Sequence, residues 1–401
     1  MKVGLVFDGD YPWDVRVWKF ATCLADHGHE VHLVCRNLGQ RAERETVDGI
    51  HVHRLRPLAN ARLNALASFP AFVNPTWVAR IADVVSTCGI EALIVRDLPL
   101  ALAGVAVGRR YAVPVLLDMA ENYPAMLRDV NRFERFRIQN VLVRNPGLAS
   151  LVERLALRLV HHVFVVIEEA RDRLLRAGVA PDRISIVRNT PNVALTQFPP
   201  SWGAPVSDVS RLTLAFVGGL EPMRGLAAAL EMVAVATQRI PELHMKIVGD
   251  GRWRGELESY SRELGVDGHV EFTGRREYQR AIFEVQRADI GLIPHRVTAH
   301  TNSTIPNKLF EYMLIGKPVL ATDMAPVRRV IEEVDCGLVY RSRQEGLEAL
   351  VRMRDETLRR RFGENGRRAV LEQYRWDHDG AALVQAVEQV SAPLCSAAHA
   401  P

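Results

Sequence analysis

Alternation between short apolar runs and longer helix-forming segments constrains this fold more than any other feature of the sequence. The runs begin at Lys2, and each has the length of a β-strand. This order is typical of a parallel sheet with helices on both faces, because a parallel strand needs a crossover connection to reach its neighbour. In the first half we expect strands at VGLVF, EVHLV, HVHRL, EALIV, PVLLD, HVFVV and ISIV.

The same pattern restarts in the second half, where LTLAFVGG repeats the strand and small-residue turn of VGLVFDGD. A stretch rich in proline, serine and glycine, residues 191–210, separates the halves and is a candidate linker. A chain of 401 residues also exceeds what one core usually organises. We predict an α/β fold of two Rossmann-like, doubly wound domains, residues 1–195 and 205–377, with a helix at about 378–395 crossing back onto the first domain. Further strands are expected at HMKIVGD, HVEFTG, ADIGLIP, KPVLATD and GLVY.

Composition excludes several other classes of protein. Hydrophobic residues make up 48% of the chain and charged residues 24%, which is ordinary for a globular protein. The five cysteines are odd in number and show no CxxC spacing, so neither a disulfide framework nor a zinc site is indicated, and a reducing cytoplasm fits best. Asp8 and Asp10 interrupt the amino-terminal apolar run before an export signal could develop, and no run resembles a membrane-spanning helix.

Positive charge is concentrated in one segment. Between Leu127 and Val160, seven arginines oppose three carboxylates, and Phe133 and Phe136 lie among them. Such a mixture can rest on an anionic membrane surface or guide an anionic acceptor, and it can equally be a solvated helix face. Without an accompanying nucleic-acid-binding motif, a nucleic acid partner is not expected.

The segment STIPNKLFEYMLIGKPVLATD, residues 303–323, predicts a short helix followed by a buried strand. Pro306 can occupy the first helical position, with Ser303 and Thr304 upstream as potential caps, so the helix is expected from Pro306 to Ile315. The free N–H groups and dipole of the first turn favour an anion such as phosphate.

Three polar residues share one side of this helix at spacings of three and four: Asn307, Lys308 and Glu311. The helix therefore suits a nucleoside diphosphate, with the carboxylate of Glu311 at the ribose.

Other candidate ligand contacts follow strand ends, where open parallel sheets bind ligands. Glycines let the backbone approach a ligand, and an arginine can neutralise a diphosphate. The candidates on the nucleotide side are Gly218, Gly219, Arg224, Gly249, Gly274, Arg275 and His295. The alternative for each is a surface or turn residue without a ligand.

In the first half, Asp8 and Asp10 form a DxD pattern, but with no supporting ligand cluster they make a poor metal site and suit turn formation or acceptor contact. We expect the acceptor near the end of the first strand and the start of the next helix, after the strand PVLLD and at the end of the first domain. The candidates are Asp10, Asp14, Arg16, Asp118, Glu121 and Asn189. Motifs of nicotinamide enzymes, zinc proteases, serine hydrolases and P-loop proteins do not occur in the sequence, and FDGDYPWDV stands where a dinucleotide fold would show GxGxxG.

Taken together, these motifs resemble the retaining glycosyltransferases of family 4, which have the GT-B fold of two domains facing across a cleft. The resemblance covers nearly the whole chain. It rests on DVRVWKFATCLADHGHEVHLV, RISIVRNTPNV with its closing Asn189, FVGGLEPMRGL, KIVGDG, VEFTG, ADIGLIP and PNKLFEYMLIGKPVLATD, in the family's order.

The resemblance implies roles for individual residues. The family's paired-glutamate motif falls on Ser303 and Glu311, so Glu311 matches the ribose-binding glutamate, and serine replaces the glutamate that contacts the donor sugar. The family's diphosphate contacts fall on Gly219 and Arg224, and Lys308 could replace a missing lysine. The histidine that many members carry after PVLLD is absent, and Asp118 or Glu121 could take a related role.

The implied activity is transfer of a sugar from a nucleoside diphosphate donor, with UDP or GDP, to a hydroxyl of a glycan or lipid-linked acceptor. The resemblance implies retained anomeric configuration, no metal or other cofactor, and work in bacterial polysaccharide or glycoconjugate assembly, in the cytoplasm or at the inner face of the membrane. Arg224 and Glu311, with Asp118 or Glu121, are the candidate catalytic residues. A nucleotide-sugar epimerase or hydrolase of the same fold, or a non-catalytic binding protein, would share parts of this pattern.

Overall fold

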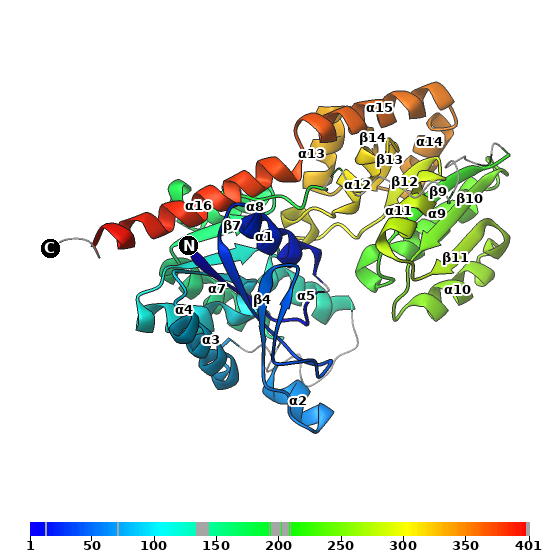
Figure 1. Cartoon of the computed structure of the whole chain (residues 1–401). Coiled ribbons are helices and arrows are strands. Elements are labelled where there is room, and N and C mark those ends of the chain that lie inside the picture. Colours follow the sequence, from blue (N-terminus) through cyan, green and yellow to red (C-terminus); the bar gives the residue numbers. More distant parts are fainter. Residues whose placement is uncertain are drawn as a thin grey trace. The chain divides into compact units, whose positions relative to one another are not determined.

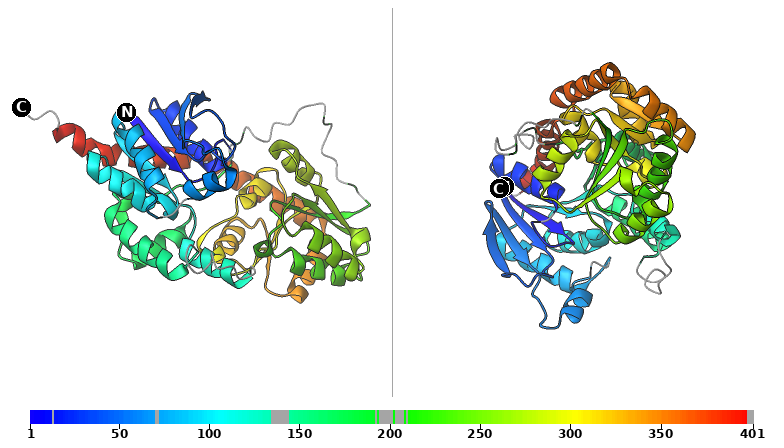
Figure 2. Two further views of the ribbon diagram at one scale, coloured as in Figure 1. Left: turned by 90° about the horizontal axis from the view of Figure 1, so that it is seen from below. Right: turned by 90° about the vertical axis from the view of Figure 1, so that its right-hand side faces the viewer.

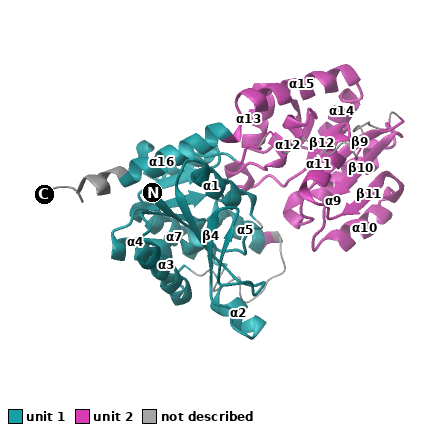
Figure 3. Cartoon of the chain, viewed as in Figure 1, with its two compact units in different colours: residues 1–131, 135–188, 377–401 teal, residues 132–134, 189–376 magenta. Residues whose placement is uncertain are grey.

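The structure, a computed structural model, describes residues 1–12, 14–69, 72–133, 144–191, 193, 202, 208 and 210–397, with side chains as far as residue 391 except that of Phe133. The predicted linker therefore lies largely outside the described residues, as does the Phe136 part of the arginine-rich segment. Two compact units make up the chain (Figure 3). Unit 1 is Met1–Asn131, Arg135–Arg188 and Asp377–Pro401, and unit 2 is Arg132–Glu134 and Asn189–Trp376.

Unit 1 is built on an eight-stranded sheet with the order β3-β4-β2-β1-β5-β6-β7-β8. Every described pair is parallel except β3 with β4. The seven predicted strands are present, whereas β3 was not predicted because RETV lacks an apolar run and lies half-exposed at the sheet edge. The strands are β1 (Lys2–Phe7), β2 (Glu30–Cys35), β3 (Arg44–Val47), β4 (Ile50–Arg54), β5 (Ala92–Arg96), β6 (Val115–Met119), β7 (His162–Val165) and β8 (Ile184–Ile186).

Helices cover both faces of this sheet, with α3, α4 and α7 packed in a row on one of them (Figure 1). Helix α1 begins where the Asp14 carboxylate accepts a hydrogen bond from the Val17 N–H at 2.9 Å. The helices are α1 (Val15–Asp26), α2 (Ala61–Ala67), α3 (Pro75–Cys88), α4 (Ala101–Tyr111), α5 (Tyr123–Phe133), α7 (Pro146–Leu159), α8 (Glu168–Arg176) and α16 (Trp376–Ala397), with short turns η1 (Leu98–Leu100) and η2 (Pro181–Arg183).

The last helix, α16, belongs to unit 1 from Asp377 onward. Figure 2 shows it, in red, alongside the blue and cyan elements of that unit. His29 Nε2 lies 3.5 Å from the Glu388 carboxylate, and Arg188 lies 3.5 Å from Asp379. The helix therefore returns to the first unit after the chain has formed the second.

Unit 2 has a six-stranded, all-parallel sheet with the order β11-β10-β9-β12-β13-β14. All six predicted strands are present. They are β9 (Leu212–Val217), β10 (Leu243–Val248), β11 (Val270–Gly274), β12 (Ile290–Ile293), β13 (Val319–Thr322) and β14 (Gly337–Tyr340). The helices are α9 (Leu226–Ala236), α10 (Arg254–Glu263), α11 (Tyr278–Gln286), α12 (Lys308–Leu314), α13 (Ala325–Val334), α14 (Arg343–Arg352) and α15 (Glu356–Glu372), and the short turns are η5 (Pro222–Arg224), η6 (Asp267–His269) and η7 (Thr301–Ser303).

Each sheet has one point where the strand order reverses. In unit 1, β1 pairs with both β2 and β5, and in unit 2, β9 pairs with both β10 and β12. Connections leave in opposite directions at such a point, which opens a crevice at the carboxyl ends of the strands, where ligands of α/β sheets bind. The loops after β1, β5, β9 and β12 are therefore the places to look for a site.

Helix α12 owes its position to close contact with α15. A Cβ atom added to Gly363 would lie 2.1 Å from the carbonyl oxygen of Gly316, just after α12, and one added to Gly366 would lie 3.2 Å from Met313 Cγ. Only residues without a side chain permit this approach.

We expect Gly363→Ala to destabilise unit 2 by about 1–3 kcal/mol, because the new methyl group must push α15 away from backbone that cannot yield. Thermal unfolding measures the change. Gly255→Ala in α10 is the matched control: its Cβ would meet no atom within 4 Å, and alanine is the better helix former. Equal unfolding midpoints for the two variants would contradict this account of the helix contact.

Candidate active site

Three glycine turns lie side by side at the carboxyl ends of β9, β10 and β11. The Gly218 N–H donates to the Val248 carbonyl at 3.0 Å, and the Gly249 N–H donates to the Gly274 carbonyl at 3.0 Å. A Cβ on Gly249 would lie 2.0 Å from the Gly218 oxygen, whereas one on Gly219 would meet no atom within 4 Å. The structure thus brings the four predicted glycines together, and Gly219 faces open space.

Arg224 and His295 meet at the reversal point of this sheet. Arg224 ends the turn after β9, His295 follows β12, and Arg224 Nη1 lies 2.9 Å from His295 Nε2. The two loops are locked together, because a Cβ on Gly225 would lie 1.8 Å from the Pro294 oxygen. Thr322 holds the second loop by donating from Oγ1 to the His295 carbonyl at 2.6 Å.

Lys308 lies directly beneath the first glycine turn. Its Nζ is 3.8 Å from the centre of the Phe216 ring and 3.0 Å from the position of a Cβ on Gly218. The side chain is 8% exposed, and Nζ has no hydrogen-bond partner among the described residues. The sequence predicted Lys308 on a polar helix side with Asn307 and Glu311, but of these three only Asn307 is exposed.

Positive charge is crowded in this part of unit 2. Burial, reinforced by the Arg224 charge, holds the pKa of Lys308 well below its usual value. Burial and the charges of Lys308 and Arg224 lower the pKa of His295 in the same way. An anion beside the glycine turns would stabilise the charged form of Lys308 and supply the missing hydrogen-bond partner.

Glu311 lies three residues after Lys308 and is half-buried. Its Oε1 accepts a hydrogen bond from the Tyr278 hydroxyl at 2.7 Å. Tyr278, the first residue of α11, was not among the predicted site residues, because the apolar pattern of α11 does not show which residue faces α12. Arg275 is exposed at the end of β11.

The predicted start of the diphosphate-binding helix was wrong. Helix α12 begins at Lys308, the Leu309 N–H donates to the Pro306 carbonyl at 3.0 Å, and Thr304 is extended. Ser303 is not a cap, since its hydroxyl donates to the His300 carbonyl at 2.8 Å within a separate short turn. The local bonds of the 298–303 loop override the capping signal.

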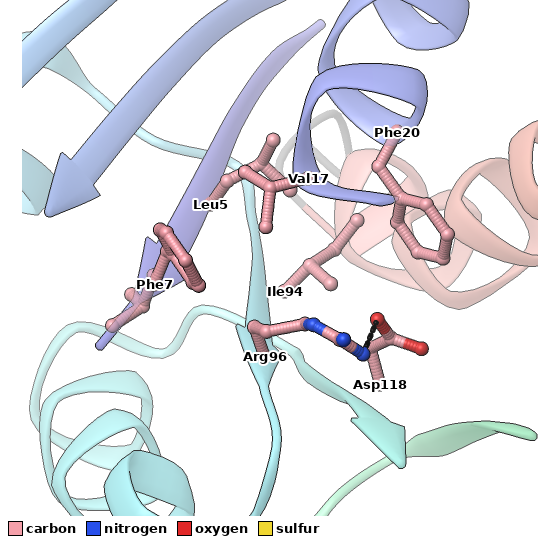
Figure 4. A pocket seen from close by; sticks show the side chains of 8 residues that line it. Leu5, Phe7, Val17, Phe20, Ile94, Arg96 and Asp118 are labelled. Atoms are coloured by element: carbon pink, nitrogen blue, oxygen red, sulfur yellow. Dashed lines mark hydrogen bonds and ion pairs between the residues drawn. The ribbon is translucent and has the colours of Figure 1, made fainter. Parts of the chain in front are cut away.

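In unit 1, Asp118 is the centre of a buried ion cluster, and Figure 4 shows its ion pair with Arg96. It is 1% exposed and lies at the end of β6. Arg16 Nε is 2.9 Å from its Oδ2, Arg16 Nη2 is 2.6 Å from Oδ1, and Arg96 Nη1 is 3.1 Å from Oδ2. Burial would raise the pKa of Asp118, but the two guanidinium groups outweigh it and lower the pKa.

Asp118 and Arg16 were expected to contact the acceptor, and the structure assigns both to internal support instead. Arg16 is 4% exposed, and its Nη1 donates to the Val187 carbonyl at 2.8 Å. Glu121 is half-buried, and its charge acts on Arg96 and Asp97, so it remains a candidate for acceptor contact.

Asp97, at the carboxyl end of β5, was missed by the sequence analysis. Its backbone has φ 60° and ψ 171°, a conformation that is essentially restricted to glycine and is seen elsewhere mainly at functional sites. Oδ1 is buried without a hydrogen-bond partner among the described residues, and burial raises the pKa of this carboxyl to about 8. The signal was the dipeptide RD after EALIV, which marks a strand end but not its place at the reversal point.

The remaining acceptor-side candidates have local roles. Asp10 accepts hydrogen bonds from the N–H groups of Leu38 and Gly39, at 2.9 and 3.0 Å, and so joins the loop after β1 to the loop after β2 instead of closing a local turn. Asp14 caps α1, and Asn189 is half-buried after β8. None of these contacts identifies a ligand.

Comparison with known proteins identifies the family. A family model described as "Glycosyl transferases group 1" matches residues 204–369, and one described as "Glycosyl transferase 4-like domain" matches residues 14–190. The two matches together cover most of the chain. This protein belongs to the GT-B glycosyltransferases of the family 4 type, as its motifs predicted.

Particular relatives are distant. The phosphatidyl-myo-inositol mannosyltransferase of Mycolicibacterium smegmatis is 28% identical over 184 residues, which is 45% of each chain, so this chain spans about half the length of the curated relatives it matches. Sucrose-phosphate synthase from Thermosynechococcus elongatus has a TM-score of 0.78 at 16% identity, covering 98% of this chain and 100% of the other. Anabaena HepE in complex with UDP-glucose has a TM-score of 0.68 at 17% identity, covering 99% and 100%. These structures share the fold.

Across the described residues, no helix combines the length and the apolar character that crossing a bilayer requires.

The cation cluster yields a prediction for Lys308→Met. The thermal unfolding midpoint should hold or rise, because a buried ammonium without a partner is removed, while affinity for a nucleoside diphosphate should fall at least about tenfold, the value of one charge-assisted hydrogen bond. Calorimetric titration with UDP, GDP and ADP measures the affinity.

Lys317→Met is the matched control for this substitution. Burial also lowers the pKa of Lys317. This lysine, however, interacts with Asp289, which precedes β12 and so lies at the amino ends of the strands, away from the glycine turns. Equal affinity losses in the two lysine variants, or no loss in Lys308→Met, would refute the assignment of Lys308 to the diphosphate.

Proposed function

We propose that this protein transfers a sugar from a nucleoside diphosphate donor to a hydroxyl group of an acceptor, with the anomeric configuration retained. Unit 2 binds the donor, and unit 1 binds the acceptor. The observation that carries the proposal is the buried, unpartnered Lys308 ammonium beneath the glycine turns, beside Arg224 and His295. The nucleotide complex of the structural neighbour HepE supports a nucleotide sugar as the donor.

The leaving diphosphate sets the main requirement for catalysis. Negative charge develops on it as the glycosidic bond breaks, and preorganised cations in a dry site stabilise such charge most effectively. Lys308 and Arg224 are fixed in place before any ligand binds, so little reorganisation accompanies the reaction. Glu311, held by the Tyr278 hydroxyl, accepts hydrogen bonds from the ribose.

The acceptor hydroxyl must lose a proton during transfer. In a same-face reaction the departing phosphate takes that proton, so a side-chain base is not required. Asp97 and Glu121 orient the acceptor at the carboxyl ends of β5 and β6, while Asp118 acts as a positioning residue through Arg96. The strained backbone and buried Oδ1 of Asp97 support this assignment.

Two variants separate the donor and acceptor assignments. Glu311→Ala should raise the KM for the donor at least about tenfold with little change in the KM for the acceptor, because a charged hydrogen bond to the ribose is lost. Asp97→Asn should instead raise the KM for the acceptor, with little change in the KM for the donor. Steady-state release of nucleoside diphosphate measures both constants, with UDP- and GDP-sugars tested against lipid-linked and soluble acceptors.

The same assay distinguishes the alternatives. Release without any acceptor would indicate a hydrolase, and conversion of the sugar without release would indicate an epimerase. Binding with neither outcome for any donor would indicate a non-catalytic protein. Nuclear magnetic resonance of the product reports the anomeric configuration, and inversion would overturn the retaining mechanism.

The acceptor or its carrier lies at an anionic membrane surface in this proposal. Helix α7 exposes a stripe of leucines at helical spacing, flanked by exposed arginines. The leucines are 41%, 56% and 43% exposed. The stripe consists of Leu148, Leu151 and Leu155, and the arginines are Arg144, Arg154 and Arg158.

We expect sedimentation with vesicles that contain phosphatidylglycerol, and little with pure phosphatidylcholine, because arginines near the surface each contribute about 1 kcal/mol with anionic lipid. Leu151→Glu should reduce the bound fraction. Leu66→Glu is the matched control, since Leu66 in α2 is 73% exposed and lies outside the stripe. A loss confined to Leu66→Glu would place the contact on α2 instead.

A further inference from the structure

Unit 1 contains a second cluster of polar side chains that the proposed transfer reaction does not use. His32 on β2, His53 on β4 and Cys88 at the end of α3 each offer an atom, and these atoms all lie within 4.8 Å of one another. The β2–β4 register pairs His32 with His51 and places His53 two residues further along the same strand, so their side chains project from one face. The ligands come from three elements, and their spacing in the sequence therefore gave no signal.

Hydrogen bonds define the protonation of both rings. His32 Nε2 lies 2.9 Å from a Glu30 carboxylate oxygen, which can only accept, so Nε2 carries the proton and Nδ1 has a free lone pair. That Nδ1 lies 3.0 Å from His53 Nε2, which must then be the donor. His53 Nδ1 is left as a second lone pair, buried and without a hydrogen-bond partner in the described structure.

This arrangement suits a metal ion better than it suits an apolar core. A buried acceptor without a partner costs free energy, and an electron-pair acceptor removes that cost. A carboxylate that orients a histidine from behind, as Glu30 orients His32, is the usual outer partner of a zinc ligand.

Nearby cations do not oppose binding, because carboxylates neutralise them. Lys2 lies 3.4 Å from Glu30. Arg80 and Arg44 lie 2.9 and 3.5 Å from Asp83, and the Arg80 guanidinium also donates to the Glu43 carbonyl. His51, stacked on His32 at 4.9 Å, is the remaining titratable ring on this face.

We propose that His32, His53 and Cys88 bind Zn²⁺, with water as the fourth ligand. The three ligand atoms lie within 4.8 Å of one another, a separation that a tetrahedral zinc ion, with Zn–N of about 2.0–2.1 Å and Zn–S of about 2.3 Å, can bridge after small side-chain rotations. Thiolate and imidazole ligands select zinc-like metals over magnesium and calcium. Cys88 is partly exposed at a helix end, so its side chain can turn toward the rings and offer the ion a route of entry.

Cobalt substitution tests the site directly. In tag-free protein carrying Cys395→Ser, one equivalent of Co²⁺ should give the intense near-ultraviolet thiolate-to-metal absorption and tetrahedral visible bands, and Zn²⁺ should displace it stoichiometrically. Cys88→Ser should abolish the thiolate band. His53→Gln should weaken Zn²⁺ binding at least about tenfold in calorimetry, since even outer-shell changes cost 10- to 100-fold.

His269→Gln is the control for nonspecific histidine binding. The His269 ring lies 5.2 Å from the His244 ring in unit 2, and among the described residues neither ring belongs to a group of three potential metal ligands. This substitution should leave the zinc affinity unchanged. Circular dichroism confirms the fold of each variant, and Zn²⁺ should raise the unfolding midpoint of the parent but not of Cys88→Ser. An absent thiolate band, or equal zinc affinity in all variants, would overturn the proposal.

Discussion

The carboxylate of Asp118 holds the carboxyl ends of the strands of unit 1 together. Through two arginines it connects β6 to α1, to β5 and, by way of the Val187 carbonyl, to the chain after β8. Removing one member of such a buried cluster leaves an uncompensated charge and typically costs 3–5 kcal/mol. The strained backbone of Asp97 depends on the same centre, because the Asp97 N–H donates to the Asp118 carbonyl at 2.8 Å. These strand ends are thus tied together where they are least exposed.

In unit 2, by contrast, the buried Lys308 ammonium is not paired with a carboxylate of the described residues in this way. The charges of Lys308 and Arg224 oppose each other near the glycine turns, and Lys308 packs on the ring of Phe216. In unit 1 the charges are balanced within the protein, and stability results. In unit 2 the proposed donor would supply the balancing charge, which is the arrangement expected where anion affinity matters more than stability of the empty site.

The sequence was sufficient for most of the fold and for part of the site. Apolar runs identified every strand except β3, which pairs antiparallel with β4 at the sheet edge and has no apolar run of its own. Motif order identified the glycine turns, Arg224, His295 and Glu311, which the structure brings to one sheet edge. The burial of Lys308 and Asp118 was not predictable. A charged residue in a helix or at a strand end is normally predicted to be exposed, and only its neighbours in space show that it is buried. Asp97 and the histidine cluster were missed for the same reason, because the order of strands in the sheet, and not the order of residues in the sequence, determines their neighbours.

The return of α16 to unit 1 has a consequence for biosynthesis. Unit 2 lies between the parts of unit 1 along the chain, and all of it leaves the ribosome before residues 377–397 do. The second unit can therefore complete its core during translation, while the first waits for the helix that covers His29. Unit 1 is therefore the first unit to be synthesised and the last to complete its fold.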